Sequence, residues 1–158
     1  MNQQLEIRLG DLLRQHDLKL VTAESCTGGL IADRITNIAG SSEYFLGGFV
    51  AYANTAKMTG LGVAHATLQA HGAVSRETVL EMAHGAIHTL GAHLALAVSG
   101  IAGPGGALPD KPIGTVWIAL VTPEGESARI FHFDKDRRGN KEDAADAALK
   151  MLIEYLEK

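Results

Sequence analysis

Residues 23–30 read AESCTGGL and place a serine, a cysteine and a threonine directly before two glycines. The apolar run KLVTA precedes this stretch, and apolar residues at helical spacing follow it up to Gly40, which predicts a strand-to-helix junction. Such a turn would expose the Ser25 hydroxyl, and the first backbone N–H groups of the helix could stabilise an oxyanion or bind a phosphate. The segment therefore has two interpretations: a serine nucleophile, or helix capping by Ser25 or Thr27, which is the commoner role of such residues.

Cys26 is the rival nucleophile in the same turn. A thiol at the start of a helix can have a lowered pKa, but its side chain would point away from that of Ser25, and a lone cysteine is most often buried filler. Because Cys26 is the only cysteine, no internal disulfide can form, and we expect a reducing, cytoplasmic location.

A serine hydroxyl needs a base to become a nucleophile, and Lys57 is the candidate in the segment AYANTAK. None of the seven histidines follows an expected strand end beside a carboxylate. A lysine has an ordinary pKa of about 10.4, so it acts as a base at neutral pH only when burial or a neighbouring cation lowers that value. The alternative for Lys57 is a solvated residue on a helix.

The elements that must position these groups alternate between strands and helices. This order predicts one α/β domain over residues 1–158: a three-layer α/β/α sandwich with a mixed, largely parallel sheet and a C-terminal antiparallel hairpin. Ser75 is expected to cap the third long helix and Asn140 the last one. The expected helices cover residues 5–13, 30–38, 76–91 and 140–155, with a short helix or single turn at 55–62; the expected strands cover 19–23, 47–54, 94–100 and a hairpin over 113–133.

Three segments rich in polar residues and glycine follow expected strands: AESCTGG, AYANTAK and VSGIAGPGG. Ligands of open α/β sheets bind beyond the carboxyl ends of the strands, so these segments predict one shared pocket. The third segment lacks the Gly-Lys-Ser/Thr of a loop that binds nucleoside triphosphates. A rigid turn between strands is therefore the alternative to a ligand-binding loop.

Composition excludes several classes of partner. Fourteen basic and eighteen acidic residues give a net charge of −4, without a basic stripe for nucleic acid. No apolar run is long enough for a membrane span. Glu81, His84 and His88 could share a helical face that holds a metal, but no second set of ligands accompanies them. We therefore expect no nucleic-acid or membrane partner, no metal and no cofactor.

Taken in order, five segments resemble the CinA C-terminal domain family, whose characterised members are nicotinamide-nucleotide amidases. The likeness extends from about Leu18 to about Leu120. The resemblance implies an α/β/α fold, a metal-free serine amidohydrolase with a Ser-Lys pair, and hydrolysis of nicotinamide mononucleotide to nicotinate mononucleotide and ammonia. It also implies a homo-oligomer, and Tyr44, Phe45 and Leu46 are expected to be apolar surface that could serve its interface. The segments are TAESCTGGLIADRIT, IAGSSEYFLGGFVAYANTAK, HGAVSRETVLEMAHGA, AVSGIAGPGG and KPIGTVWIAL.

The same resemblance implies the roles of individual residues. Lys57 would take the proton of Ser25, which attacks the carboxamide while N–H groups at the helix start hold the oxyanion. Arg137, helped by Lys141, would meet the nucleotide phosphate. The implied catalytic residues are Ser25, Lys57 and Tyr52, and the implied substrate-binding residues are Thr27, Gly28, Asn54, Ser99, Gly100, Gly103, Gly105, Arg137 and Lys141.

One departure from the family pattern lies in the segment KDRRGNK. The family often has a glycine where Lys135 stands and a second arginine where Lys141 stands, and Arg137 matches the first arginine. A lysine cannot offer the planar fork with which arginine binds a phosphate or carboxylate. The alternative function is therefore a nucleotide-binding relative with weakened or lost catalysis.

Overall fold

The computed structural model describes residues 3–158, which form a five-stranded mixed sheet between two layers of helices. This architecture confirms the predicted α/β class. The elements in chain order are α1 (Gln4–Gln15), β1 (Leu20–Glu24), α2 (Leu30–Thr36), a 3₁₀ turn η1 (Ser41–Glu43), β2 (Phe45–Val50), α3 (Asn54–Leu61), α4 (His65–His71), α5 (Arg76–Leu90), β3 (Leu94–Gly100), β4 (Thr115–Thr122), β5 (Gly125–His132) and α6 (Arg137–Leu156).

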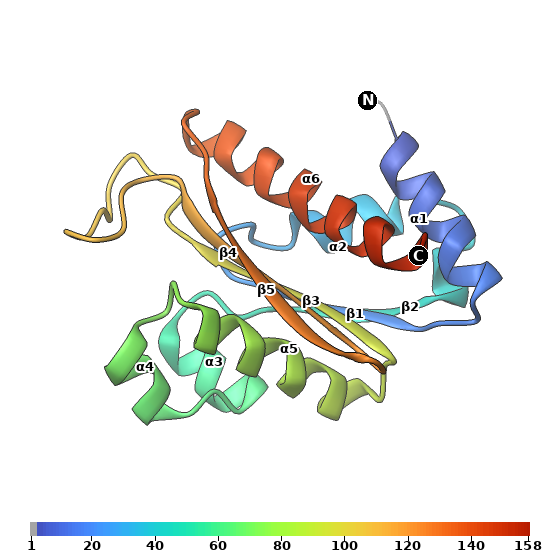
Figure 1. Cartoon of the computed structure of the whole chain (residues 1–158), viewed down its shortest axis with the longest axis horizontal. Helices are drawn as coiled ribbons and strands as arrows, with labels where there is room; N and C mark the ends of the chain where they lie inside the picture. The colour runs from blue at the N-terminus through green and yellow to red at the C-terminus, as the bar shows by residue number, and fades with distance from the viewer. Residues whose placement is uncertain (1–2) are drawn as a thin grey trace.

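The helices divide between the two faces of the sheet. Figure 1 shows α1, α2 and α6 on one face and α3, α4 and α5 on the other. Each face has its own apolar core, and every residue of β1 is buried between them. Burial on both faces explains why the central strands have nearly continuous apolar sequences. Within residues 3–158, no helix combines the length and the apolarity that crossing a bilayer requires.

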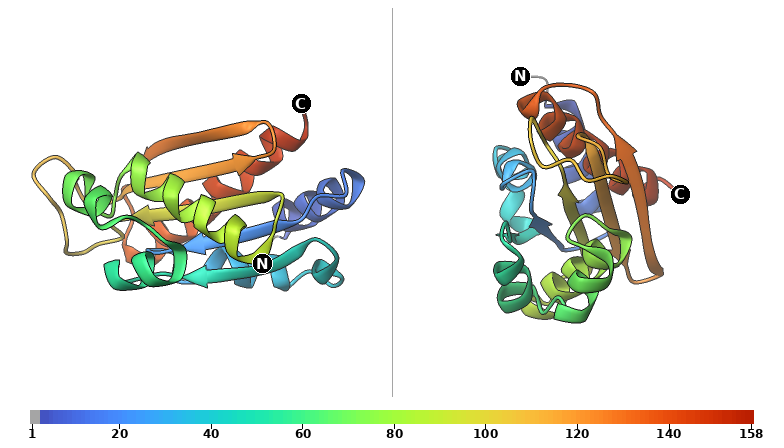
Figure 2. Two further views of the ribbon diagram at one scale, coloured as in Figure 1. Left: turned by 90° about the horizontal axis from the view of Figure 1, so that it is seen from below. Right: turned by 90° about the vertical axis from the view of Figure 1, so that its left-hand side faces the viewer.

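The strand order is β2-β1-β3-β4-β5, and the direction of pairing changes across it. β1 runs parallel to both of its neighbours, β2 and β3, whereas β3–β4 and β4–β5 are antiparallel. The predicted C-terminal hairpin is confirmed. The further antiparallel pair arises because a loop at 101–114, without a crossover helix, returns the chain beside β3. Figure 2 shows this loop projecting beyond the end of the sheet.

The pairing of β2 with β1 contains one extra residue. Leu20 pairs with Phe45, but Val21 pairs with Gly47, so Leu46 forms a β-bulge. The predicted strand at 47–54 is therefore placed too late. β2 already begins at Phe45, and the chain stays beside β1 only as far as Ala51, whose N–H donates to the Glu24 carbonyl at 2.9 Å.

Two helix starts test the capping predictions. Ser75 is confirmed as the cap of α5, because its hydroxyl accepts a hydrogen bond from the Thr78 N–H at 3.2 Å. The prediction that Asn140 caps the last helix is wrong. Asp136 takes that role by accepting from the Gly139 N–H at 2.8 Å, and Asn140 lies inside the first turn of α6. Its amide instead donates to the Ala102 carbonyl at 3.0 Å and ties α6 to the loop after β3.

Candidate active site

The carboxyl ends of β1, β2 and β3 meet around a pocket of about 250 Å³. Ser25 follows β1, Tyr52 follows β2 by two residues, and the glycine-rich segment begins at the end of β3. The three polar segments therefore lie together, as the parallel order of these strands requires. The predicted site residues that line this pocket are Ser25, Tyr52, Asn54, Lys57, Ser99, Gly100, Gly103, Gly105 and Arg137.

The amine of Lys57 lies 2.9 Å from the hydroxyl oxygen of Ser25. Lys57 belongs to α3, on the face of the sheet opposite α2, and only 1% of it is exposed. Ser25 is also buried, and its Oγ is 3.5 Å from the Tyr52 carbonyl, farther than from the amine. The two side chains whose pairing the sequence predicted are in direct contact.

Two carbonyl oxygens complete the surroundings of the Lys57 amine. Nζ donates to the carbonyls of Ala51 at 3.0 Å and Tyr52 at 2.8 Å. Within residues 3–158, no carboxylate lies within 4.0 Å of this nitrogen. Burial lowers the pKa of Lys57, since the charged ammonium loses its hydration without gaining a counter-ion.

The number of partners suits both protonation states of Lys57. A neutral amine has two N–H donors, which match the two carbonyls, and one lone pair, which can accept the Ser25 O–H. An ammonium has three donors, and the Ser25 oxygen can accept the third. A proton can therefore move between Ser25 and Lys57 without rearrangement of the heavy atoms.

Cys26 lines the same pocket but is poorly suited to nucleophilic attack. It is buried within the core on the α2 and α6 face. Burial raises the pKa of its thiol to about 12, and the charge of Glu24 acts in the same direction. The thiol stays protonated near neutral pH, whereas only the thiolate is a strong nucleophile.

The expectation that the first N–H groups of the helix are free for an oxyanion is wrong for α2. The N–H groups of Ile31 and Ala32 donate to the two carboxylate oxygens of Glu24 at 2.8 and 3.0 Å. The N–H groups that directly follow Ser25 are those of Cys26 and Thr27, and no backbone carbonyl within the described part of the chain accepts from them. The N–H groups of this turn that have no backbone acceptor therefore lie before α2 and not at its start.

Arg137 connects the rim of the pocket to two other segments. Its Nη1 donates to the Gly103 carbonyl at 2.9 Å, and its Nη2 donates to the Tyr52 hydroxyl at 3.0 Å. Tyr52 thus contacts Lys57 through its carbonyl and Arg137 through its hydroxyl. The guanidinium holds the glycine-rich loop and the end of β2 around the opening.

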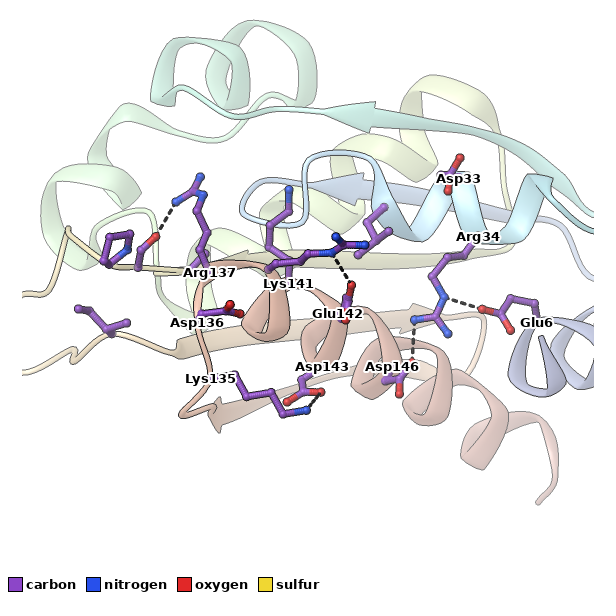
Figure 3. Close-up of a pocket in the computed structure, with 16 residues that line it drawn as sticks. Glu6, Asp33, Arg34, Lys135, Asp136, Arg137, Lys141, Glu142, Asp143 and Asp146 are labelled. Carbon is purple, nitrogen blue, oxygen red and sulfur yellow. Dashed lines mark hydrogen bonds and ion pairs between the residues drawn. The ribbon is translucent and has the colours of Figure 1, made fainter. Parts of the chain in front are cut away.

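A second, larger cleft of about 1160 Å³ adjoins the pocket on the α2 and α6 face and shares Ala102, Gly103 and Arg137 with it. Figure 3 shows its charged lining, in which Lys135 pairs with Asp143. Arg138, which also lines the cleft, pairs with Glu142. The Lys141 amine also lines this cleft, and no hydrogen bond or ion pair between the described residues engages it.

The structure separates three predicted substrate-binding residues from the pocket around Ser25. Thr27 is only 1% exposed, and its hydroxyl has no hydrogen-bond partner within residues 3–158. Gly28 lies near Lys141: a Cβ at Gly28 would be 3.5 Å from the Lys141 amine. Lys141 lies at the second cleft and does not line the pocket. Thr27 and Gly28 therefore belong to the turn after β1, and Lys141 to the second cleft, outside the pocket around Ser25.

Sequence reasoning missed Ala73 and Val74, which line the pocket from the segment before α5 and carry no chemical signal. It also missed the role of Glu24. A signal for Glu24 was present, because Gly29 directly precedes α2 and has no side chain with which to cap it.

The chain matches the family model described as the CinA C-terminal domain over residues 2–156. It is 50% identical over 156 residues to a CinA-like protein of Chloroherpeton thalassium, covering 96% of this chain and 37% of that protein. A CinA-like protein of Salinibacter ruber is 49% identical, and the match covers 92% of this chain and 35% of that protein. This chain thus spans little more than a third of the length of these relatives.

Solved structures have the same fold over almost the whole chain. A CinA superfamily protein of Klebsiella pneumoniae superposes with a TM-score of 0.96 at 34% identity, covering 99% of both chains. The competence/damage inducible protein CihA of Agrobacterium tumefaciens superposes with a TM-score of 0.93 at 44% identity, covering 99% of this chain and 95% of that chain.

Proposed function

Because the chain belongs to the CinA C-terminal domain family, we propose that it is a nicotinamide-nucleotide amidase that hydrolyses nicotinamide mononucleotide to nicotinate mononucleotide and ammonia. The substrate and reaction follow from the resemblance of the sequence to the characterised amidases. The observation that carries the proposal is the 2.9 Å contact between the buried Lys57 amine and the Ser25 hydroxyl.

In the first half of the reaction, the Lys57 lone pair takes the Ser25 proton while Oγ bonds to the carboxamide carbon. The carbonyl electron pair moves onto oxygen and forms an oxyanion. The N–H groups of Cys26 and Thr27 are the candidate donors to it, as in other serine hydrolases where the residue after the nucleophile donates. Removal of the amine from water favours the neutral form that this step requires.

In the second half, the oxyanion collapses and the carbon–nitrogen bond breaks. The proton held by Lys57 passes to the nitrogen, which leaves as ammonia, and an acyl ester remains on Ser25. Lys57 then takes a proton from water, whose oxygen attacks the ester and releases the carboxylic acid. Ser25 recovers its proton, so that one water is consumed for each amide.

Cations at the junction of the pocket and the second cleft support an anionic substrate. Arg137 lines both cavities, and Lys141 lies beside Gly28 without a protein partner within residues 3–158. A phosphate attached to the ribose of the substrate would meet these two groups. Arg137 has N–H donors beyond the two that bind Tyr52 and Gly103.

The test is release of ammonia from nicotinamide mononucleotide by the wild-type protein, by Ser25→Ala and by Cys26→Ala. We expect turnover by the wild type and by Cys26→Ala, and a loss of about 10³-fold or more in Ser25→Ala. No ammonia from the wild type, or equal release by Ser25→Ala, would refute the proposal. Loss of activity only in Cys26→Ala would assign the nucleophile to the thiol.

A second candidate function is nucleotide binding without turnover, which Lys141 at the expected arginine position favours. Calorimetric titration with nicotinamide mononucleotide would then show binding, while the ammonia assay stays blank. Activity that appears in Lys141→Arg would identify the missing planar fork as the cause.

A further inference from the structure

Glu24 is the residue immediately before Ser25, yet its side chain lies on the other face of the sheet. Ser25 contacts Lys57 of α3, whereas the carboxylate of Glu24 reaches α2. Adjacent residues at the end of a strand point to opposite faces, which explains this division. Glu24 is a carboxylic acid that is only 1% exposed.

The Glu24 carboxylate caps α2 from outside the helix. Oε1 accepts from the Ile31 N–H at 2.8 Å, and Oε2 accepts from the Ala32 N–H at 3.0 Å. The position that normally supplies a capping side chain is Gly29, which has none. The two oxygens of Glu24 therefore satisfy two helix donors that would otherwise be unpaired.

This contact closes the turn that carries Ser25. The Ser25 N–H fixes the start of the turn by donating to the Val98 carbonyl at 2.9 Å. The Glu24 carboxylate fixes its end at α2. Between them lie Gly28 and Gly29, both with positive φ and both with more conformational freedom than other residues.

We propose that Glu24 is a positioning residue for Ser25: its carboxylate joins β1 to the start of α2 and thereby fixes the turn from which the Ser25 hydroxyl reaches Lys57. This inference rests on the proposed function, in which Ser25 is the nucleophile. Glu24 does not touch the reacting atoms and acts through the backbone. A displacement of about 1 Å at a reacting group can lower the rate about 100-fold, so a loosened turn should affect turnover before it affects binding.

Glu24→Gln is the variant that tests this role at nearly constant size. The amide oxygen can accept from one N–H, but the amide NH₂ would face the other N–H, donor against donor. Glu81→Gln is the matched control, because the Glu81 carboxylate similarly accepts from the Ala64 N–H at the start of α4. Glu81 lies on α5 and does not line the pocket around Ser25.

The experiment measures labelling of Ser25 by a sulfonyl fluoride, followed by intact mass, besides kcat and KM for nicotinamide mononucleotide. Labelling reports the reactivity of Ser25 and does not depend on the substrate. We expect Glu24→Gln to be labelled about 10- to 100-fold more slowly than the wild type, with kcat lowered similarly and KM little changed. The pH at which the labelling rate of Glu24→Gln is half-maximal should equal the wild-type value, because Lys57 lies on the other face of the sheet. Glu81→Gln should be labelled at the wild-type rate.

Hydrogen exchange at the Ile31 and Ala32 amides provides an independent readout. Faster exchange at these amides should accompany slower labelling in Glu24→Gln. If Glu24→Gln does not fold, Glu24→Asp, whose shorter carboxylate cannot span both N–H groups, is judged by the same measures. The positioning role would be overturned if Glu24→Gln were labelled at the wild-type rate or if the pH midpoint of its labelling shifted. It would also be overturned if both Glu24 variants failed to fold. Labelling of Ser25 in a wild-type protein that releases no ammonia would refute the proposed substrate and leave this inference standing, whereas no labelling of the wild type would overturn both.

Discussion

Gly85 lies at the crossing of α5 and α3, and its replacement by alanine tests how closely these helices pack. A Cβ at Gly85 would lie 1.8 Å from the Leu61 carbonyl oxygen and 2.6 Å from the carbonyl carbon. Ordinary contact begins at 3.4 Å, so the two backbones would have to separate by about 1.6 Å. Backbone atoms cannot rotate away as a side chain would, so the helices themselves must move.

The expected magnitude follows from two opposing effects. Alanine in a helix is favoured over glycine by about 1 kcal/mol, whereas overpacking of this kind costs about 1–3 kcal/mol, and the large overlap places Gly85→Ala at the upper end. We therefore expect the free energy of unfolding to fall by about 2 kcal/mol net. Since Lys57 is one turn before Leu61 in α3, kcat should fall by up to about 100-fold.

Gly60→Ala is the control, because Gly60 lies in the same α3 and a Cβ there has no heavy atom within 4 Å. This variant should gain up to about 1 kcal/mol and keep its activity. Urea denaturation and ammonia release, measured on both variants, separate the two effects. Wild-type or higher stability in Gly85→Ala would refute the close α3–α5 crossing.

Four further predictions concern the ionisable groups of the site. Lys57→Met should lower kcat by about 10²- to 10⁴-fold. It should also raise the free energy of unfolding near neutral pH, because the pKa of Lys57 in the folded protein lies below its unfolded value of about 10.4. The buried ammonium therefore destabilises the wild type below the folded pKa, and this loss of stability disappears as the pH rises towards 10.4. Urea titrations of both proteins at several pH values can follow the difference. For the same reason, kcat/KM of the wild type should rise with pH through a midpoint below about 10.4, and a midpoint at or above that value would contradict a lysine base made neutral by burial. Iodoacetamide at pH 8 should leave ammonia release unchanged, because the pKa of Cys26 is about 12, and rapid inactivation at this residue would contradict its burial. Arg137→Lys should raise KM by about 10-fold, because lysine cannot bind Gly103, Tyr52 and a phosphate with one planar group, and an unchanged KM would exclude the guanidinium from substrate binding.

The parts of the fold that were predictable from sequence are those encoded locally. The apolar spacing around the turn at Ser25, the cap at Ser75 and the turn after Thr122 each depend on neighbouring residues, and the structure has all three. Helix α4 was not predicted, since it buries one residue, Leu68, and the Ala64 N–H directly before it donates to Glu81 from α5. A seven-residue helix with one apolar anchor has no periodicity to detect.

Long-range competition explains the other differences. Asn140 and Asp136 are both good capping residues, and the choice between them was decided by Ala102, which accepts from the Asn140 amide inside the fold. The pairing of Ser25 with Lys57 was anticipated, because Lys57 was the candidate base among the residue types and the resemblance to a family implies the same pair. The two carbonyls that bind the amine were not anticipated, because backbone partners leave no trace in residue type.

The extra residue Leu46 in β2 acts as a spacer for the site. It determines how far β2 extends beside β1, and hence which carbonyls, those of Ala51 and Tyr52, arrive beside the Lys57 amine. Deleting one residue from this strand would shift the chain by about 3.3 Å and turn its alternating groups to the opposite face. The number of residues in β2, a strand with no reactive side chain of its own, therefore determines which carbonyls surround the Lys57 amine.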